Sequence, residues 1–179
     1  MKQKSSGRMA FCGLTAAMST VVLLLSFVPV SEIGLPALAG ALIIPTVIEL
    51  NRKYALSVYI ATALLALLMV PSWECKLLYV GFFGCYPTLK ATLERQANLW
   101  WIWITKLAVF NIAMIAIYWL LITFLHLDTA AFTIAGVSMP WLILLLGNGV
   151  FVLYDIGLSR CIQTYLQKGS PRLRRLFRF

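Results

Sequence analysis

The chain contains six apolar stretches, each long enough to cross a lipid bilayer as a helix. A membrane-spanning α-helix needs about 20 predominantly apolar residues, within a range of about 17–25. Hydrophobic residues make up 61% of the 179 residues and charged residues only 12%, whereas soluble domains are about one-quarter charged. The sequence therefore predicts an all-α membrane protein, a six-transmembrane-helix bundle with helices at about 9–30, 33–50, 54–70, 77–93, 99–125 and 139–166.

The distribution of basic residues predicts how this bundle is oriented. Lys and Arg concentrate in the cytoplasmic loops of membrane proteins. Fourteen of the fifteen Lys and Arg residues fall on one side of the predicted bundle, and only Lys76 falls on the other. We therefore expect both termini in the cytoplasm and a multi-pass protein of the cell membrane. Residues 1–166 form the transmembrane domain, whose first helix is retained because no convincing cleavage site follows it.

Residues 167–179 form a basic cytoplasmic tail, "QKGSPRLRRLFRF". Such a run of basic residues can contact a protein or nucleic acid, or it can lie on anionic lipid, where each basic residue contributes about 1 kcal/mol. The tail is too short to offer a nucleic-acid-binding fold. We therefore expect membrane lipid as its partner and no nucleic acid.

No catalytic motif is recognisable in the sequence. The chain has no HExxH motif, no Walker-type glycine loop and no nucleophile elbow. The four cysteines have neither metal-ligand nor disulfide spacing and are expected to be small apolar residues of the helices. We therefore expect a protein that is not an enzyme and that binds no cofactor and no metal.

Two amides lie deep in the predicted fifth and sixth helices. With a rise of about 1.5 Å per residue, Asn111 lies about 18 Å from the cytoplasmic start of its helix. Asn148 lies about 14 Å from the outer start of the next helix, so both fall near the bilayer midplane. The pair can form a hydrogen bond between helices, or Asn148, between Gly147 and Gly149, can form the floor of a ligand site.

Asp155 is the deepest acidic residue, near the inner end of the sixth helix. An ionised carboxylate facing lipid costs about 2.5–3.5 kcal/mol, so Asp155 requires a partner. Lys106 lies at a similar depth on the antiparallel fifth helix. We therefore expect a structural ion pair between Lys106 and Asp155.

Aromatic residues gather on the outer side of the predicted third to sixth helices. Some belong to the aromatic belt at the membrane interface, and the others can line a cavity. Few bulky rings face them from the first two helices. This set comprises Trp73, Tyr79, Phe82, Phe83, Tyr118, Trp119, Phe124 and Trp141.

The stretch "YVGFFGCYP", residues 79–87, weakens the predicted fourth helix. Pro87 removes one backbone hydrogen bond and pushes against the carbonyl of Phe83. Gly81, Gly84 and Cys85 give this helix a small face where a neighbouring backbone or a ligand can approach. Short helices interrupted by Gly and Pro indicate transporter binding sites, although tight packing around a kink explains the same pattern.

Small residues also form a stripe on the predicted first helix, "MAFCGLTAAMST". Ala10, Gly13, Ala17 and Thr20 follow helical spacings of three and four residues. Such stripes allow a second helix to pack closely in lipid. That helix can belong to this chain or to another protein.

The chain resembles the substrate-binding S components of energy-coupling factor transporters in its six helices within fewer than 200 residues, its cytoplasmic termini and this stripe. It also resembles related uncharacterised six-helix proteins of bacterial plasma membranes. The resemblance implies a subunit that binds a small, vitamin-like solute on its outer side and has no ATPase activity of its own. The implied partners are a coupling transmembrane subunit and its ATPases. The residues that match the docking face of that family are Gly13, Ala16, Ala17 and Thr20.

The same resemblance implies a solute site formed by the outer halves of the later helices. Rings would enclose the solute, and Glu74, Lys76 and Asn148 would orient its polar groups; a site of stacked rings with few polar contacts suits a ring-bearing vitamin. The ring residues are Trp73, Tyr79, Phe83, Tyr118 and Trp141. The alternative is a non-transporting scaffold, an accessory subunit of an envelope complex, with these rings facing lipid.

Overall fold

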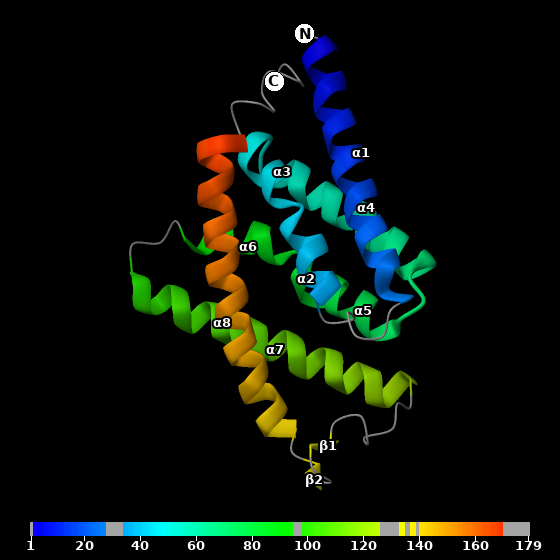
Figure 1. Ribbon diagram of the computed structural model, residues 1–179, viewed down its shortest axis with the longest axis vertical. Helices are drawn as coiled ribbons and strands as arrows, with labels where there is room; N and C mark the ends of the chain where they lie inside the picture. The colour runs from blue at the N-terminus through cyan, green and yellow to red at the C-terminus, as the bar shows by residue number, and fades with distance from the viewer. Residues whose placement is uncertain are drawn as a thin grey trace.

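The computed structural model describes residues 2–27, 34–94, 98–125, 133–134, 137–138 and 140–169. Nearly all of these residues are helical (Figure 1). The basic tail at 170–179 lies outside the described residues. The elements are α1 (Lys2–Leu24), η1 (Leu25–Phe27), α2 (Gly34–Ala41), α3 (Ile44–Glu49), α4 (Arg52–Met69), α5 (Trp73–Leu78), η3 (Tyr79–Phe83), α6 (Tyr86–Leu93), α7 (Leu99–Leu125), β1 (Thr133–Ile134), β2 (Val137–Ser138), α8 (Pro140–Thr164) and η5 (Tyr165–Gly169).

Four helical segments of the described chain are long and apolar enough to cross a membrane. The segments are Ser6–Phe27, Arg52–Met69, Trp100–Thr123 and Leu144–Gln167. Many large apolar side chains on them are exposed, among them Leu68 at 84% and Ile112 at 68%. Soluble proteins rarely expose large contiguous apolar patches, so the chain is a helical membrane protein.

The predicted second and fourth helices are each divided in the structure. The segment at 33–50 becomes α2 and α3, separated by Leu42 and Ile43, and the segment at 77–93 becomes α5, the π-helix η3 and α6. In neither segment, within the described residues, does one α-helix of spanning length remain. Figure 1 shows α2 and α3 between α1 and α8, with the long helix α7 lying across α8. The β1–β2 pair is antiparallel, with Thr133 opposite Ser138.

The core consists of two clusters of buried side chains. The first joins α1, α2, α4 and α5 and contains Leu23, Ala39, Val58 and Tyr79. The second is largely aromatic and joins η3, α6, α7 and α8. Its rings are Phe82, Phe83, Tyr86, Phe110 and Phe151, with Tyr154 packed against them. The Phe110 and Phe151 rings stack 4.6 Å apart, which fixes α7 against α8.

Candidate functional site

The two divided segments share the same local design. Pro45 stands in the first turn of α3 and Pro87 in the first turn of α6. Proline fits this position because the first backbone N–H groups of a helix have no partner within the helix. The residues just before these helices, Ile43 and Cys85, keep right-handed helical backbone angles, so the chain continues in the same sense through each junction. The predicted weakness of "YVGFFGCYP" is thus a local loss of regular α-helical hydrogen bonding, with a π-helix followed by a turn at Gly84 and Cys85.

Other parts of the protein contact the backbone of η3. The N–H of Gly84 donates to the carbonyl of Tyr79 at 2.8 Å, in the π-helical pattern. The hydroxyl of Tyr59 on α4 donates to the carbonyl of Val80 at 2.6 Å. A Cβ on Gly40 of α2 would lie only 2.2 Å from the carbonyl oxygen of Phe83. The two interrupted segments therefore touch backbone to backbone, and a side chain from α4 satisfies a carbonyl that η3 leaves available.

The rings that we predicted around a solute occupy different environments. Tyr79 is fully buried in the first core cluster, whereas Phe83 is buried in the second, edge-on to Tyr154 with centroids 5.2 Å apart. Tyr118 is half-buried, and the side chain of Trp141 lies outside the described residues. Tyr79 and Phe83 are thus packed inside the protein and do not face lipid.

Polar groups do lie near the start of the interrupted segment 73–93. The ammonium group of buried Lys76 lies 3.7 Å from the ring centroid of Trp73, which is half exposed. Tyr79, three residues after Lys76, buries its hydroxyl group beside Thr62 of α4, without a hydrogen bond of regular geometry among the described residues. Glu74 is half-buried on the same short helix, α5. The start of this segment thus carries an ammonium group, an aromatic ring, a carboxyl group and a hydroxyl group.

The two deep amides pair with each other. Asn111 Nδ2 donates to Asn148 Oδ1 at 2.9 Å, and Asn148 Nδ2 donates to Asn111 Oδ1 at 3.0 Å. The carbonyls of Leu107 and Leu144 accept the remaining amide hydrogens at 2.8 Å. This is the hydrogen bond between helices that the sequence allowed. A solute would have to break it to reach Asn148.

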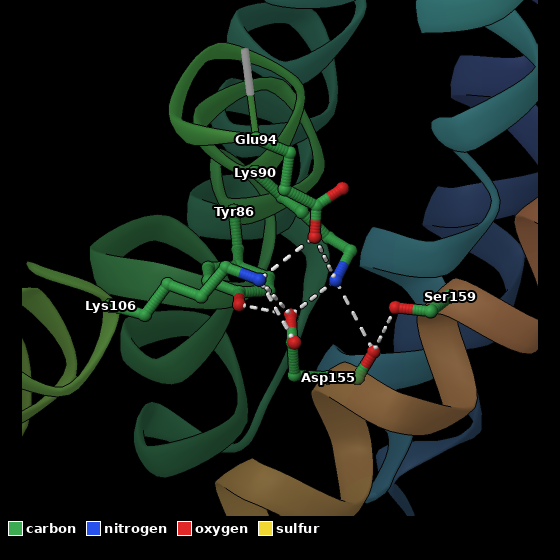
Figure 2. A network of polar contacts seen from close by, with 6 residues as sticks. All are labelled: Tyr86, Lys90, Glu94, Lys106, Asp155 and Ser159. Carbon is green, nitrogen blue, oxygen red and sulfur yellow. Dashed lines mark hydrogen bonds and ion pairs between the residues drawn. The ribbon is translucent and has the colours of Figure 1, made fainter. Parts of the chain in front are cut away.

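A buried charge network joins α6, α7 and α8 (Figure 2). Asp155 of α8 lies at its centre, and the expected ion pair is present: Lys106 Nζ is 2.9 Å from Asp155 Oδ2. Lys90 Nζ lies 2.5 Å from Asp155 Oδ1, and the hydroxyl of Tyr86 donates to the same oxygen. Both lysines also contact Glu94 Oε1 at 2.8 Å. Lys90, Lys106 and Asp155 are each at least 97% buried.

Sequence reasoning missed Lys90, Tyr86 and Glu94 as members of this network. The available signal was their spacing of four residues, which places all three on one face of a helix. Lys90 was instead counted among the charges that orient the bundle. Buried charges require partners. A deep acid such as Asp155 therefore predicts that every basic residue at a similar depth, Lys90 included, is a candidate partner.

Glu94 differs from the other members because its side chain is 43% exposed. It follows the last residue of α6. Partial burial works to raise the pKa of its carboxyl, but hydrogen bonds from Lys106 and Lys90 outweigh burial and lower the pKa below the ordinary value. Its contribution to stability is therefore present above the ordinary Glu pKa and is lost as the pH falls through the lowered one.

The residues predicted to dock a partner on α1 divide between two faces. Gly13 and Ala17 are exposed, and a Cβ on Gly13 would meet nothing within 4 Å. Ala16 and Thr20 are buried, with the Thr20 hydroxyl donating to the carbonyl of Ala16. The turn of about 100° per residue places these two beside Ser19, which donates to the carbonyl of Ala39 on α2. Ala16 and Thr20 therefore pack internally, and Gly13 and Ala17 remain available.

The fold and these polar groups define a helical membrane protein whose interrupted segments and buried charges lie between its long helices. No protein-family model, curated protein or solved structure matches the chain. Its function therefore has to be inferred from its own residues.

Proposed function

We propose that the chain is the membrane-embedded substrate-binding subunit of an uptake system, with the topology and binding mode of an energy-coupling factor S component. It would capture a small, ring-bearing solute and work with a coupling transmembrane subunit and its ATPases. In this proposal the segments 33–50 and 77–93 cross the bilayer as interrupted helices. They complete six spans, with both termini on the cytoplasmic side of a bacterial plasma membrane.

The buried hydroxyl of Tyr79 at the interruption is the observation that supports this proposal most directly. It is buried at the beginning of η3, one turn after the buried ammonium of Lys76. Interrupted helices at the centre of a membrane protein are typical of solute sites. The ammonium of Lys76 beside the half-exposed ring of Trp73 fits a solute that has an aromatic ring and an acidic group.

Replacing Tyr79 by phenylalanine is expected to release the solute. The change removes only the hydroxyl group, whose hydrogen bond to a ligand contributes about 0.5–1.5 kcal/mol, or more if the partner is charged. Native mass spectrometry of the protein purified from its own membranes measures the fraction that retains a small molecule. We expect that fraction to fall severalfold in Y79F.

Thr88→Val is the matched control, because Thr88 also has a buried hydroxyl without a hydrogen-bond partner in the described structure. It belongs to α6, beyond the interruption. T88V should retain the small molecule as the wild type does. Equal retention by Y79F and the wild type, or equal loss in both variants, would contradict a solute site at Tyr79.

Leucine at Gly13 and Ala17 is expected to abolish co-purification with a coupling subunit. The two residues give α1 a flat exposed strip, and a bulky side chain there prevents a close helix–helix approach. Gly157→Leu is the control, since Gly157 is also exposed with open space around its Cβ position, but on α8. Affinity purification followed by quantitative mass spectrometry gives the readout. An unchanged complex with G13L/A17L would reject the docking face while leaving solute binding open.

A further inference from the structure

Glu94 and the two lysines that hold it differ sharply in accessibility. Lys90 and Lys106 come from α6 and α7, and their ammonium groups lie almost fully inside the protein. Both point to one oxygen of Glu94, at 2.8 Å each, while the Glu94 side chain is 43% exposed. Figure 2 shows the carboxylate between the two ammonium groups, on the side opposite Asp155. The structure thus has two buried donors and one acceptor whose side chain reaches solvent.

The charge balance requires an anion at this position. Asp155 balances one of the two positive charges, and Glu94 balances the other. Removing one partner from a buried ion pair is strongly destabilising, because the remaining charge stays out of water. If the Glu94 side chain moves into solvent, another anion has to take its place between the lysines.

The surroundings fit a phosphate group. Arg52 of α4 donates to the carbonyl of Ala91 at 2.7 Å, which brings a third cation to the same end of α6. Trp100 and Trp101, at the start of α7, are exposed by 81% and 62%. Exposed tryptophans at a helix end mark the depth of the lipid headgroups. Basic pockets between helices at that depth bind phosphate headgroups, and lysine is a common phosphate ligand.

We infer that Lys90 and Lys106 form a binding site for a phosphate group, and that the Glu94 carboxylate occupies this site until a phosphate displaces it. The phosphate can belong to the headgroup of an anionic lipid or to a free phosphate compound. Both present the same oxygens to the two ammonium groups. This site lies at the end of α6, apart from Tyr79, and does not depend on the proposed solute function.

Glu94→Gln tests the inference, because it removes the competing charge and keeps the size of the side chain. The full-length protein is placed in nanodiscs of phosphatidylcholine with increasing phosphatidylglycerol, and native mass spectrometry counts the retained anionic lipids. We expect E94Q to retain phosphatidylglycerol about fivefold more strongly than the wild type, the effect of one charge near the membrane surface. A second arm titrates inorganic phosphate into the neutral nanodiscs and follows the thermal unfolding of the protein.

Glu49→Gln is the matched control. Glu49 is a half-buried acid at the end of α3 that accepts a hydrogen bond from Tyr165. The ion pairs of the two lysines described above are with Asp155 and Glu94. Retention that rises only in E94Q supports a lipid headgroup, and stabilisation by inorganic phosphate only in E94Q supports a free phosphate. Equal responses of E94Q and E49Q, or no response of E94Q in either arm, would overturn the inference. If E94Q does not fold, Glu94→Asp, which draws the carboxylate back from the lysines, replaces it with the same expected direction.

Discussion

Replacing Asp155 by asparagine is expected to lower the free energy of unfolding by about 3–5 kcal/mol. The change keeps the shape of the side chain but removes the charge at the centre of the network. Lys90 and Lys106, both almost fully buried, would then share the single, partly exposed carboxylate of Glu94. Chemical unfolding in detergent micelles, followed by circular dichroism, measures the loss. Single changes of this size occur only through a few mechanisms, of which an unpaired buried charge is one.

Ser159→Ala provides the control for this prediction. The Ser159 hydroxyl donates to the backbone carbonyl of Asp155 at 2.9 Å, so it belongs to the same network without carrying charge. Its loss should cost about 0.5–1.5 kcal/mol. Combining D155N with Lys106→Gln should cost less than the sum of the two single changes, because the pair is in contact. Additive losses, or a D155N variant as stable as S159A, would show that the charge is not what joins α6, α7 and α8.

The contacts between the long helices could be predicted from the sequence. Lys106 and Asp155 were matched by depth, and so were Asn111 and Asn148, because a helix advances by a constant rise per residue. Both contacts are present in the structure. This reasoning works for α7 and α8 because they are uninterrupted, and because a polar group in an apolar helix has few partners to choose from.

The interruptions and their contacts were less accessible to sequence reasoning. Pro45 and Pro87 marked where α3 and α6 begin, but the position of a proline does not show how the helical hydrogen bonds before it are rearranged. The π-helix η3 has no local sequence rule that would have located it. The contact between Gly40 and Phe83 depends on how α2 crosses η3, which is a tertiary property.

Gly40→Ala is the second change for which we expect a large effect. The added Cβ would lie 2.2 Å from the carbonyl oxygen of Phe83 and 2.9 Å from its carbonyl carbon. These are backbone atoms, so the clash cannot be relieved by rotating a side chain, and α2 must move away from η3. Overpacking in a core costs about 1–3 kcal/mol, and occasionally more. We expect the upper end of this range, measured by the same unfolding experiment.

Alanine substitutions at two other glycines distinguish the backbone clash at Gly40 from the general effect of adding a methyl group. A Cβ on Gly34, at the start of α2, meets nothing within 4 Å, so G34A should be neutral or slightly stabilising. A Cβ on Gly81 meets only the side chain of Ile117, which can rotate away, so G81A should have an intermediate cost. The expected order of destabilisation is therefore G40A, then G81A, then G34A. If G40A were as stable as G34A, the close approach of α2 to η3 would be wrong, and with it the crossing of the two interrupted segments on which the solute proposal depends.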